Sequence, residues 1–280
     1  MGKVRGKFSE VDNKMRLNLK KISAAAVAAT ILLAVAAHST PKAAYIWRQL
    51  EDGLLYTSYS FSISEKDTIK INAFMIDPVK FKLDVATAKD EVDGATAYEL
   101  AQKSGALLMV NGGFFTPEHK TIGLVIRDGK QLSPLHNTSW WSVFTIKNGI
   151  PSILKPSQFK SSDAVDLALQ AGPRLVVDGN IQKLKEGIAI RSAIGITKDK
   201  KVVIAITSGQ GISMSELARR MKGNLWQGGL DCPDAMALDG GSSSQLYAKI
   251  GDFKYSQPGL ARITNGLGIF RKSNKKTRDS

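Results

Sequence analysis

The sequence predicts an α+β fold: a β-rich single domain of mixed sheets with a few packed helices. From residue 58 onward, short apolar or β-branched segments alternate with turn residues, which is typical of strands joined by hairpins. Only two segments carry a clear helix start. With 280 residues, 43% of them hydrophobic and 23% charged, the chain is long enough to bury one large core.

The N-terminal segment predicts export. A basic stretch that ends in Lys20 and Lys21 precedes the uncharged apolar residues 22–37, and small residues follow, which is the layout of a secretory signal. The apolar run is shorter than the about 20 residues that a membrane-spanning helix needs. We therefore expect residues 1–44 to be a signal peptide, with an uncleaved N-terminal membrane anchor as the alternative. The expected location is periplasmic or extracellular.

The strands of the domain, residues 45–271, are predicted from apolar content and from turn residues. Asp-Gly and Asn-Gly pairs suit the left-handed positions of a type I′ turn, so each pair predicts a hairpin. The pairs are Asp128-Gly129, Asn148-Gly149 and Asp178-Gly179. The predicted strands are residues 69–75, 81–86, 106–110, 122–126, 130–132, 143–146, 175–177, 193–196 and 202–207.

Two helices are predicted from their first turns. Thr96 with Glu99, and Ser213 with Glu216, both have the spacing of a capping box, in which each side chain bonds the other residue's backbone N–H. Each segment then continues with amphipathic spacing to a glycine, Gly105 and Gly223 respectively. The basic residues 272–280 are expected to be a disordered tail.

The charge distribution argues against a nucleic-acid-binding protein. The formal net charge is +14, but residues 1–21 carry seven Lys or Arg against two acidic residues, and residues 271–280 carry five against one. Two basic ends on a mildly basic body are typical of a targeting segment and a solvated terminus. We therefore predict no nucleic-acid partner, and a membrane contact only through an uncleaved N-terminal segment.

No cofactor is predicted. Cys232 is the single cysteine, which excludes an internal disulfide and a cysteine-built zinc site. The histidines have no metal-binding spacing, and neither a Walker motif nor a dinucleotide fingerprint is present. Calcium stays open, because Asp231 and Asp234 lie near Asp239, although the EF-hand spacing is absent.

Three glycine-rich segments indicate a ligand site. They are residues 111–115, 170–174 and 238–244, and each follows an apolar stretch. Glycines at strand ends let backbone approach a ligand closely, whereas strained turns or bulges are the structural alternative. The occurrence of three such segments favours a site.

Asp239 is the leading candidate for chemistry, because it stands between a buried strand and a Gly-Gly-Ser turn. Its carboxylate could act as a nucleophile or base, or stabilise positive charge on a sugar ring; an Asx-type cap is the alternative. Glu216 is a second candidate, although the capping box already accounts for it. Ser242 and Ser243 supply hydroxyls but do not form the Gly-x-Ser-x-Gly elbow of an activated-serine hydrolase.

Arg174 and Arg191 are candidates for binding a phosphate, because a guanidinium fork matches two phosphate oxygens. Surface ion pairs are the alternative role for both. The neighbouring Trp140 and Trp141 favour core packing over stacking against a sugar.

Five motifs in order resemble the phosphodiester glycosidase family, which includes the catalytic domain of N-acetylglucosamine-1-phosphodiester α-N-acetylglucosaminidase. The resemblance spans roughly residues 69–270, and Ser242 stands where a third glycine is expected. The motifs are Asn111-Gly-Gly-Phe-Phe115, Gly172-Pro-Arg-Leu-Val-Val-Asp-Gly179, Arg191-Ser-Ala-Ile-Gly195, Thr207 with Glu216-Leu-Ala218, and Leu238-Asp-Gly-Gly-Ser-Ser243.

The resemblance implies an exported hydrolase that cleaves the glycosidic C–O bond of a sugar-1-phosphodiester of the N-acetylglucosamine type, in envelope or exopolysaccharide metabolism. A phosphate leaves as a stabilised anion, so the site needs donors for the phosphate and one carboxylate for the sugar cation. Arg191 or Arg174, with backbone amides of the paired glycines, would supply the donors. The expected catalytic residues are Asp239, Arg191 and Glu216. The expected substrate-binding residues are Asn111, Gly112, Gly113, Phe114, Arg174, Thr207, Gly240, Gly241, Ser242 and Ser243.

Two other classes stay open. A non-catalytic carbohydrate-binding or envelope-assembly protein would keep the glycine-rich cleft without cutting its ligand. A phosphodiesterase would cut the P–O bond instead of the C–O bond.

Overall fold

The computed structural model describes residues 47–62, 68–88, 93–160, 164–224, 226 and 228–272. They belong to one compact unit, Tyr45–Ser280. The segment expected to be a signal peptide or anchor, and nearly all of the expected basic tail, lie outside the described residues. Within the described ranges, no helix has the length and apolar character needed to cross a membrane.

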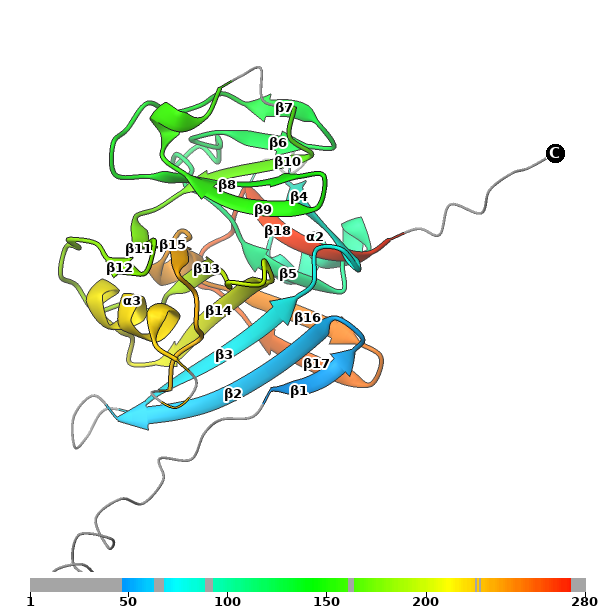
Figure 1. Cartoon of the computed structure of the whole chain (residues 1–280). Coiled ribbons are helices and arrows are strands. Elements are labelled where there is room, and N and C mark those ends of the chain that lie inside the picture. Colours follow the sequence, from blue (N-terminus) through cyan, green and yellow to red (C-terminus); the bar gives the residue numbers. More distant parts are fainter. Residues whose placement is uncertain are drawn as a thin grey trace, which may run out of the picture. The chain divides into compact units, whose positions relative to one another are not determined.

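Strands dominate the described part of the chain (Figure 1). The strands are β1 (Arg48–Glu51), β2 (Leu54–Ser62), β3 (Thr68–Ile76), β4 (Phe81–Thr87), β5 (Leu108–Asn111), β6 (Val125–Arg127), β7 (Lys130–Ser133), β8 (Ser142–Lys147), β9 (Ile150–Leu154), β10 (Leu167–Ala171), β11 (Arg174–Val177), β12 (Asn180–Ile181), β13 (Ser192–Ile196), β14 (Val202–Gly209), β15 (Asp234–Ala237), β16 (Leu246–Ile250), β17 (Phe253–Gln257) and β18 (Asn265–Arg271). The helices are α2 (Ala97–Ser104) and α3 (Met214–Lys222), with 3-10 turns η1 (Pro156–Gln158) and η3 (Gly241–Ser243). The β-rich character predicted from the sequence is confirmed.

The strands form three sheets. Their orders are β1-β2-β3-β14-β13-β15-β11-β12, β7-β6-β10-β8-β9 and β17-β16-β5-β18-β4. Every pairing between the described strands is antiparallel, so the expectation of mixed sheets was wrong. Seven of these fifteen pairings join consecutive strands, for which a short connection allows only the antiparallel direction. The other eight join strands far apart in the sequence, and no local pattern encodes their direction.

The predicted hairpins are confirmed. Asp128 and Gly129 have φ of 50° and 73°, and they join β6 to β7. The Asn148-Gly149 and Asp178-Gly179 turns have the same left-handed geometry and join β8 to β9 and β11 to β12. The consecutive strands β13 and β14 also pair as a hairpin.

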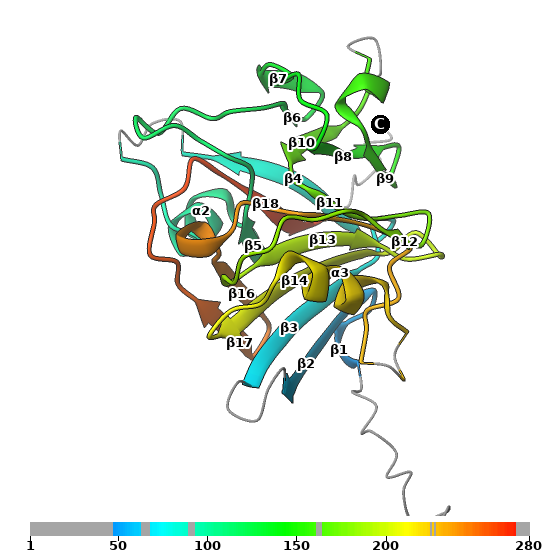
Figure 2. The same ribbon diagram turned by 90° about the vertical axis from the view of Figure 1, so that its left-hand side faces the viewer.

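The main hydrophobic core lies between the three sheets, and each helix covers an outer face. Phe74, Val110 and Phe144, one from each sheet, are fully buried in this core. α3 lies over the large sheet (Figure 2) and buries Leu217 and Met221. α2 packs against β5, β16 and β18.

The helix caps were predicted correctly at α2 and only in half at α3. Thr96 and Glu99 form the complete capping box. At α3 the Ser213 hydroxyl accepts the N–H of Glu216, but the Glu216 carboxylate does not return the bond. It lies instead 2.6 Å from Arg219 Nε and 2.7 Å from Arg220 Nε. A charge-assisted bond to a guanidinium is stronger than one to a backbone amide.

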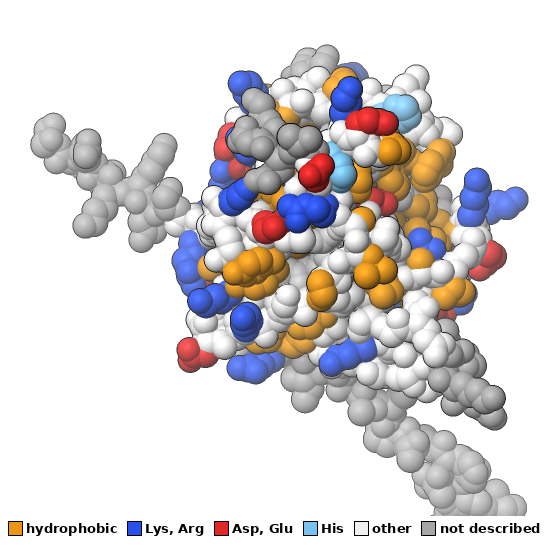
Figure 3. All heavy atoms as spheres, turned by 180° about the vertical axis from the view of Figure 1, so that it is seen from behind, with side chains coloured by type: hydrophobic (Ala, Val, Ile, Leu, Met, Phe, Trp, Pro, Cys, Tyr) orange, Lys and Arg blue, Asp and Glu red, His pale blue; other side chains and the backbone are white. Residues whose placement is uncertain are grey.

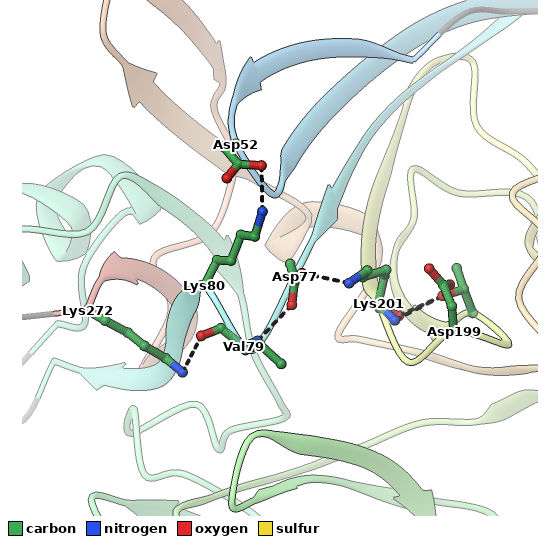
Figure 4. Close-up of polar contacts among 8 residues, drawn as sticks. Asp52, Asp77, Val79, Lys80, Asp199, Lys201 and Lys272 are labelled. Carbon is green, nitrogen blue, oxygen red and sulfur yellow. Dashed lines mark hydrogen bonds and ion pairs between the residues drawn. The ribbon is translucent and has the colours of Figure 1, made fainter.

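A polar network fixes the turn between β3 and β4 (Figure 4). One carboxylate oxygen of Asp77 accepts from the N–H of Val79 at 2.8 Å, and the other from Lys201 Nζ at 2.6 Å. Burial acts to raise the pKa of Asp77, but the bonds from Lys201 and Val79 outweigh it and hold that pKa below its usual value. This carboxylate therefore has a structural role.

Candidate active site around Asp239

Three loops from distant parts of the chain meet at the C-terminal end of β15. The N–H of Asp239 donates to the Gly112 carbonyl at 3.1 Å, which joins the loop after β15 to the loop after β5. The N–H of Gly241 donates to the Ile190 carbonyl at 2.8 Å, which adds the segment before β13. From the sequence, the glycine-rich segments were predicted to lie at strand ends, but not which of them contact one another.

The buried side chain of Asn111 links the loop after β15 to the start of β13 and to the residue before β16. Its side chain is fully buried, and Nδ2 donates to the carbonyl of Asp239 at 2.7 Å. Its Oδ1 accepts from the Ser192 hydroxyl at 2.8 Å and from the N–H of Gln245 at 3.2 Å. All the polar groups of Asn111 are thus used inside the protein, so it positions the backbone of Asp239 and does not touch a substrate.

The Asp239 carboxylate is half-buried and has no cationic partner among the ion pairs of the described residues. One oxygen accepts from the N–H of Gly240 at 2.9 Å, and the Ser243 hydroxyl also donates to the carboxylate. Burial raises the pKa of Asp239, while these two donors act to lower it. A carboxylate with a raised pKa beside an open turn is suited to take part in a reaction.

Arg191 lies beside this turn. Its Nη2 donates to the Gly187 carbonyl at 2.8 Å, and Nε to the Ile212 carbonyl at 3.4 Å. Its Nη1 would lie 3.1 Å from a Cβ built on Gly240, so the guanidinium adjoins the Asp239 turn directly. Burial lowers the pKa of Arg191, and no ion pair in the described ranges includes it. Its charge is therefore available to an anion.

Thr207 fixes Arg191 from β14. Its hydroxyl accepts the backbone N–H of Arg191 at 2.8 Å, and its own N–H donates to the Arg191 carbonyl at 2.8 Å. The Thr207 residue is 0% exposed. It can therefore influence a substrate only through Arg191.

The backbone amides of the paired glycines are not free to bind a phosphate, contrary to the expectation from the sequence. Gly112 and Gly113 donate to the carbonyl and the Oδ1 of Asn265, both at 2.9 Å. Gly240 donates to Asp239, and Gly241 to Ile190. Each amide already has an acceptor, so a phosphate at this site would need side-chain donors.

Close packing explains most of these glycines. A Cβ on Gly112 would lie 2.0 Å from Oδ1 of Asn265, and one on Gly113 would lie 2.3 Å from the Gln170 carbonyl. Gly241 is different, because it has open space around it but a φ of +62°. The glycines therefore let the loops pack closely together, but their amides do not serve as donors to a ligand.

The serines that follow occupy different positions. Ser243 is 4% exposed and uses its hydroxyl on Asp239. Ser242 is exposed at the rim, and its carbonyl accepts from the N–H groups of Leu260 and Ala261 at 2.8 and 2.9 Å. Only Ser243 acts on the carboxylate.

Arg174 and Glu216 lie away from Asp239. Arg174 donates to the Ile153 carbonyl at 3.1 Å and lies 3.8 Å from Asp234, at the opposite end of β15 from Asp239. Glu216 lies on α3, where its ion pairs with Arg219 and Arg220 occupy both of its oxygens. The hydrogen bonds and ion pairs of these two residues lie away from the Asp239 turn. Arg174 has the ion-pair role considered from the sequence, whereas Glu216 pairs with two arginines instead of completing the capping box.

An aromatic cluster adjoins the site, and we call Phe114, Trp140 and Trp141 the aromatic shelf. The Phe114 ring lies 4.6 Å from the Trp141 ring and 6.2 Å from the Trp140 ring, measured between centroids. Trp141 is 7% exposed and packs as expected, but Trp140 is 56% exposed. Figure 3 shows hydrophobic side chains gathered around a hollow on one face of the molecule.

No group of three or more His, Cys, Asp or Glu side chains that could hold a metal ion is found in the described ranges. Asp234 accepts from the N–H of Asp178 and pairs with Arg174. Asp231 is exposed. These contacts do not build a calcium site from the two residues.

Comparison with known proteins identifies the family. A model of the phosphodiester glycosidase family matches residues 104–270, which is more than half of the chain. The chain belongs to the phosphodiester glycosidase family. The matched range contains Asp239, Arg191 and all three glycine-rich segments, so the resemblance seen in the motifs is confirmed.

One curated protein is similar to this chain in sequence, and two solved structures are similar to it in fold. The chain is 25% identical over 201 residues to the uncharacterized protein YigE of Escherichia coli, covering 66% of this chain and 76% of that protein. The catalytic domain of zebrafish N-acetylglucosamine-1-phosphodiester α-N-acetylglucosaminidase, auto-inhibited by its pro-peptide, has a TM-score of 0.62 at 15% identity, covering 85% and 91% of the two chains. A hypothetical protein from Synechocystis has a TM-score of 0.57 at 15% identity, covering 84% of this chain and only 65% of that one.

Proposed function

We propose that this phosphodiester glycosidase is an exported hydrolase that cleaves the bond between the anomeric carbon of a sugar and a phosphodiester oxygen. Membership of the family supports a hydrolase of sugar phosphodiesters. The observation that carries the rest concerns two adjacent groups, the half-buried carboxylate of Asp239 and the guanidinium of Arg191. Neither has an ion-pair partner within the described part of the chain. The carboxylate of Asp239 suits the positive charge that develops on a sugar ring, and the guanidinium of Arg191 suits the negative charge of a leaving phosphate.

In the proposed reaction Arg191 binds the phosphate, and Asp239 faces the anomeric carbon. The anomeric C–O bond breaks, and its electron pair leaves with the phosphate oxygen. A phosphomonoester is a good leaving group because its last ionisation has a pKa of about 6. The charge of Asp239 stabilises the positive sugar ring, or Asp239 acts as the nucleophile or the base toward water. Water supplies the hydroxyl group of the released sugar, and its other proton passes to Asp239 where that residue is the base, or otherwise to solvent.

The N-acetylglucosamine type of sugar, export, and a place in envelope or exopolysaccharide metabolism are also proposals. The resemblance of the motifs supports the sugar, and the basic-then-apolar pattern of residues 1–37 supports export. Secretion of an alkaline phosphatase fused after residue 44 would test export, with a fusion that lacks residues 1–44 as the control.

The test of the activity uses purified protein with UDP-N-acetylglucosamine and with a simple sugar-1-phosphodiester, in water labelled with oxygen-18. The label is expected in the released sugar; a label in the phosphate would mean cleavage of the P–O bond and would contradict the proposal. The anomeric proton, followed by NMR, reports the stereochemistry. Parallel assays with EDTA and with added Ca²⁺ test whether the reaction depends on a metal.

Two variants locate the reaction. Asp239→Asn is expected to lower kcat about 1,000-fold, on the scale of losing one preorganised charged group at a reacting centre. Glu216→Gln is the matched control, and it is expected to keep most of the activity because Glu216 contacts Arg219 and Arg220 on α3. A folded protein that turns over neither donor would favour the carbohydrate-binding alternative.

A further inference from the structure

Trp140 has a large apolar side chain that is exposed to solvent and is not needed to fill the core. Its indole is 56% exposed, whereas its neighbour Trp141 is 7% exposed. The two rings meet edge to face at 5.5 Å, with 85° between their planes. Trp141 is wedged against Gly172, since a Cβ there would lie 2.8 Å from the Cα of Trp141. The buried tryptophan therefore anchors the loop, and the exposed one is presented to solvent.

The loop before the shelf is held at a fixed position. Gln170 is 1% exposed, and its Oε1 accepts from the N–H of Leu124 at 2.8 Å and from the N–H of His136 at 2.9 Å. Its Nε2 donates to the His136 carbonyl at 2.7 Å. Three bonds from one buried amide leave the loop little freedom. A rigid exposed aromatic ring can bind a ligand at a low cost in conformational entropy.

The shelf is continuous with the Asp239 site. Phe114 follows Gly112 by two residues, and the Gly112 carbonyl accepts the N–H of Asp239. A Cβ built on Gly240, the residue after Asp239, would lie 3.1 Å from Nη1 of Arg191. Asp239 is thus linked to the shelf through Gly112 and to Arg191 through Gly240. With the phosphate at Arg191 and the reacting sugar at Asp239, the shelf would lie on the Gly112 side of the site, where a longer substrate would continue.

We propose that the indole of Trp140 stacks against a pyranose ring one or more units beyond the reacting sugar, so that the substrate is the 1-phosphodiester of an oligosaccharide or polysaccharide. The inference rests on the proposed function. The C–H groups on the face of a pyranose ring form an apolar surface, which packs against an aromatic face while the hydroxyl groups stay hydrated.

The test compares donors of different length. The probes are an N-acetylglucosamine-1-phosphodiester and the same donor extended by two further N-acetylglucosamine units, with kcat/KM measured for each. The extended donor is expected to be favoured about tenfold, and Trp140→Ala to remove that preference without changing kcat/KM for the short donor. Trp226→Ala is the matched control, because Trp226 is 78% exposed and lies beyond α3.

Other outcomes overturn the inference. Equal kcat/KM for both donors, or an equal loss on both in Trp140→Ala, would mean that Trp140 binds no further sugar. A loss confined to UDP-N-acetylglucosamine would mean that the indole stacks on the base. If no donor is hydrolysed, the proposed function fails first, and calorimetric titration with chitotriose decides the inference: binding lost in Trp140→Ala but kept in Trp226→Ala supports it, and absence of binding to the unmodified protein overturns it.

Discussion

Asp77 and Asp239 are two aspartates at strand ends with opposite electrostatic surroundings. Both follow buried strands, and both accept a hydrogen bond from a nearby backbone N–H, Val79 for the first and Gly240 for the second. Asp77 also binds Lys201 at 2.6 Å, and its pKa is lowered (Figure 4). Asp239 receives only the Ser243 hydroxyl in addition, and burial raises its pKa.

The difference shows how one residue type serves two purposes. The carboxylate of Asp77 is paired with an ammonium group, and its lowered pKa means that its charged form stabilises the fold. At Asp239, Arg191 is adjacent, but its Nη2 and Nε are held by the carbonyls of Gly187 and Ile212. The charge of the carboxylate is left uncompensated, which costs stability and leaves it available to a substrate.

The largest expected effect is the loss of kcat in Asp239→Asn, compared with the same substitution at Asp77. Asp239→Asn lowers kcat about 1,000-fold and leaves the free energy of unfolding at pH 7 equal or slightly higher, because a charged form disfavoured by burial is removed. Asp77→Asn leaves kcat within about twofold but lowers the free energy of unfolding by about 1 to 2 kcal/mol, because Lys201 loses a charge-assisted bond. Urea unfolding and steady-state kinetics measure both quantities.

The two variants are each other's control. The pH dependence of stability separates them further, since the Asp77 contribution is lost as pH falls through its lowered pKa. The Asp239 carboxyl acts in the opposite sense: folding is most favoured below the unfolded pKa of 3.8 and loses stability as pH rises through the raised pKa. An Asp77→Asn variant that lost kcat while staying stable would break the contrast.

A smaller effect is expected at the arginines. Arg191→Lys keeps the charge but loses the planar fork, so KM for the phosphodiester is expected to rise about tenfold to 100-fold. Arg174→Lys is the matched control, since Arg174 contacts Asp234 and Ile153, and it is expected to leave KM unchanged. A rise in KM only in Arg174→Lys would place the phosphate at the other end of β15.

The smallest effect is a displacement of the pH profile. If the reaction needs ionised Asp239, activity falls as pH falls through its raised pKa. Ser243→Ala removes a donor to the carboxylate, so the pKa of Asp239 rises further and the acid limb of kcat/KM moves to higher pH. Ser242→Ala, at the exposed neighbour, is expected to leave the limb in place. A limb that moved down in Ser243→Ala would exclude Asp239 as the titrating group.

Local features of the fold were predictable from the sequence, and long-range ones were not. The Asp-Gly and Asn-Gly turns fix hairpins through the left-handed conformation of two adjacent residues, so a dipeptide is enough to predict each hairpin. The pairing of β3 with β14 joins Ile76 to Val202, and no local pattern encodes it. The mixed-sheet expectation failed for this reason.

Only part of the candidate site's geometry was predictable, because Arg174 and Glu216 were also expected there but lie elsewhere. Asp239 and Arg191 stand out by type and position, and the structure places them together. The predicted function of the glycine amides depended on acceptors that only the folded chain supplies, chiefly Asn265. Gln170 was not recognised as the support of the aromatic shelf, although a single amide in the apolar run of β10 was a usable indication.

Asn111 has a consequence for the order in which the molecule forms. Its side chain bonds residues 81, 128 and 134 positions away in the chain. Contacts of such high sequence separation are costly in loop entropy and are typical of slow folding. The candidate site therefore cannot exist in an isolated hairpin or sheet, and recovery of the proposed activity after dilution from denaturant would time the completion of the whole β-structure, after any signal from its local turns.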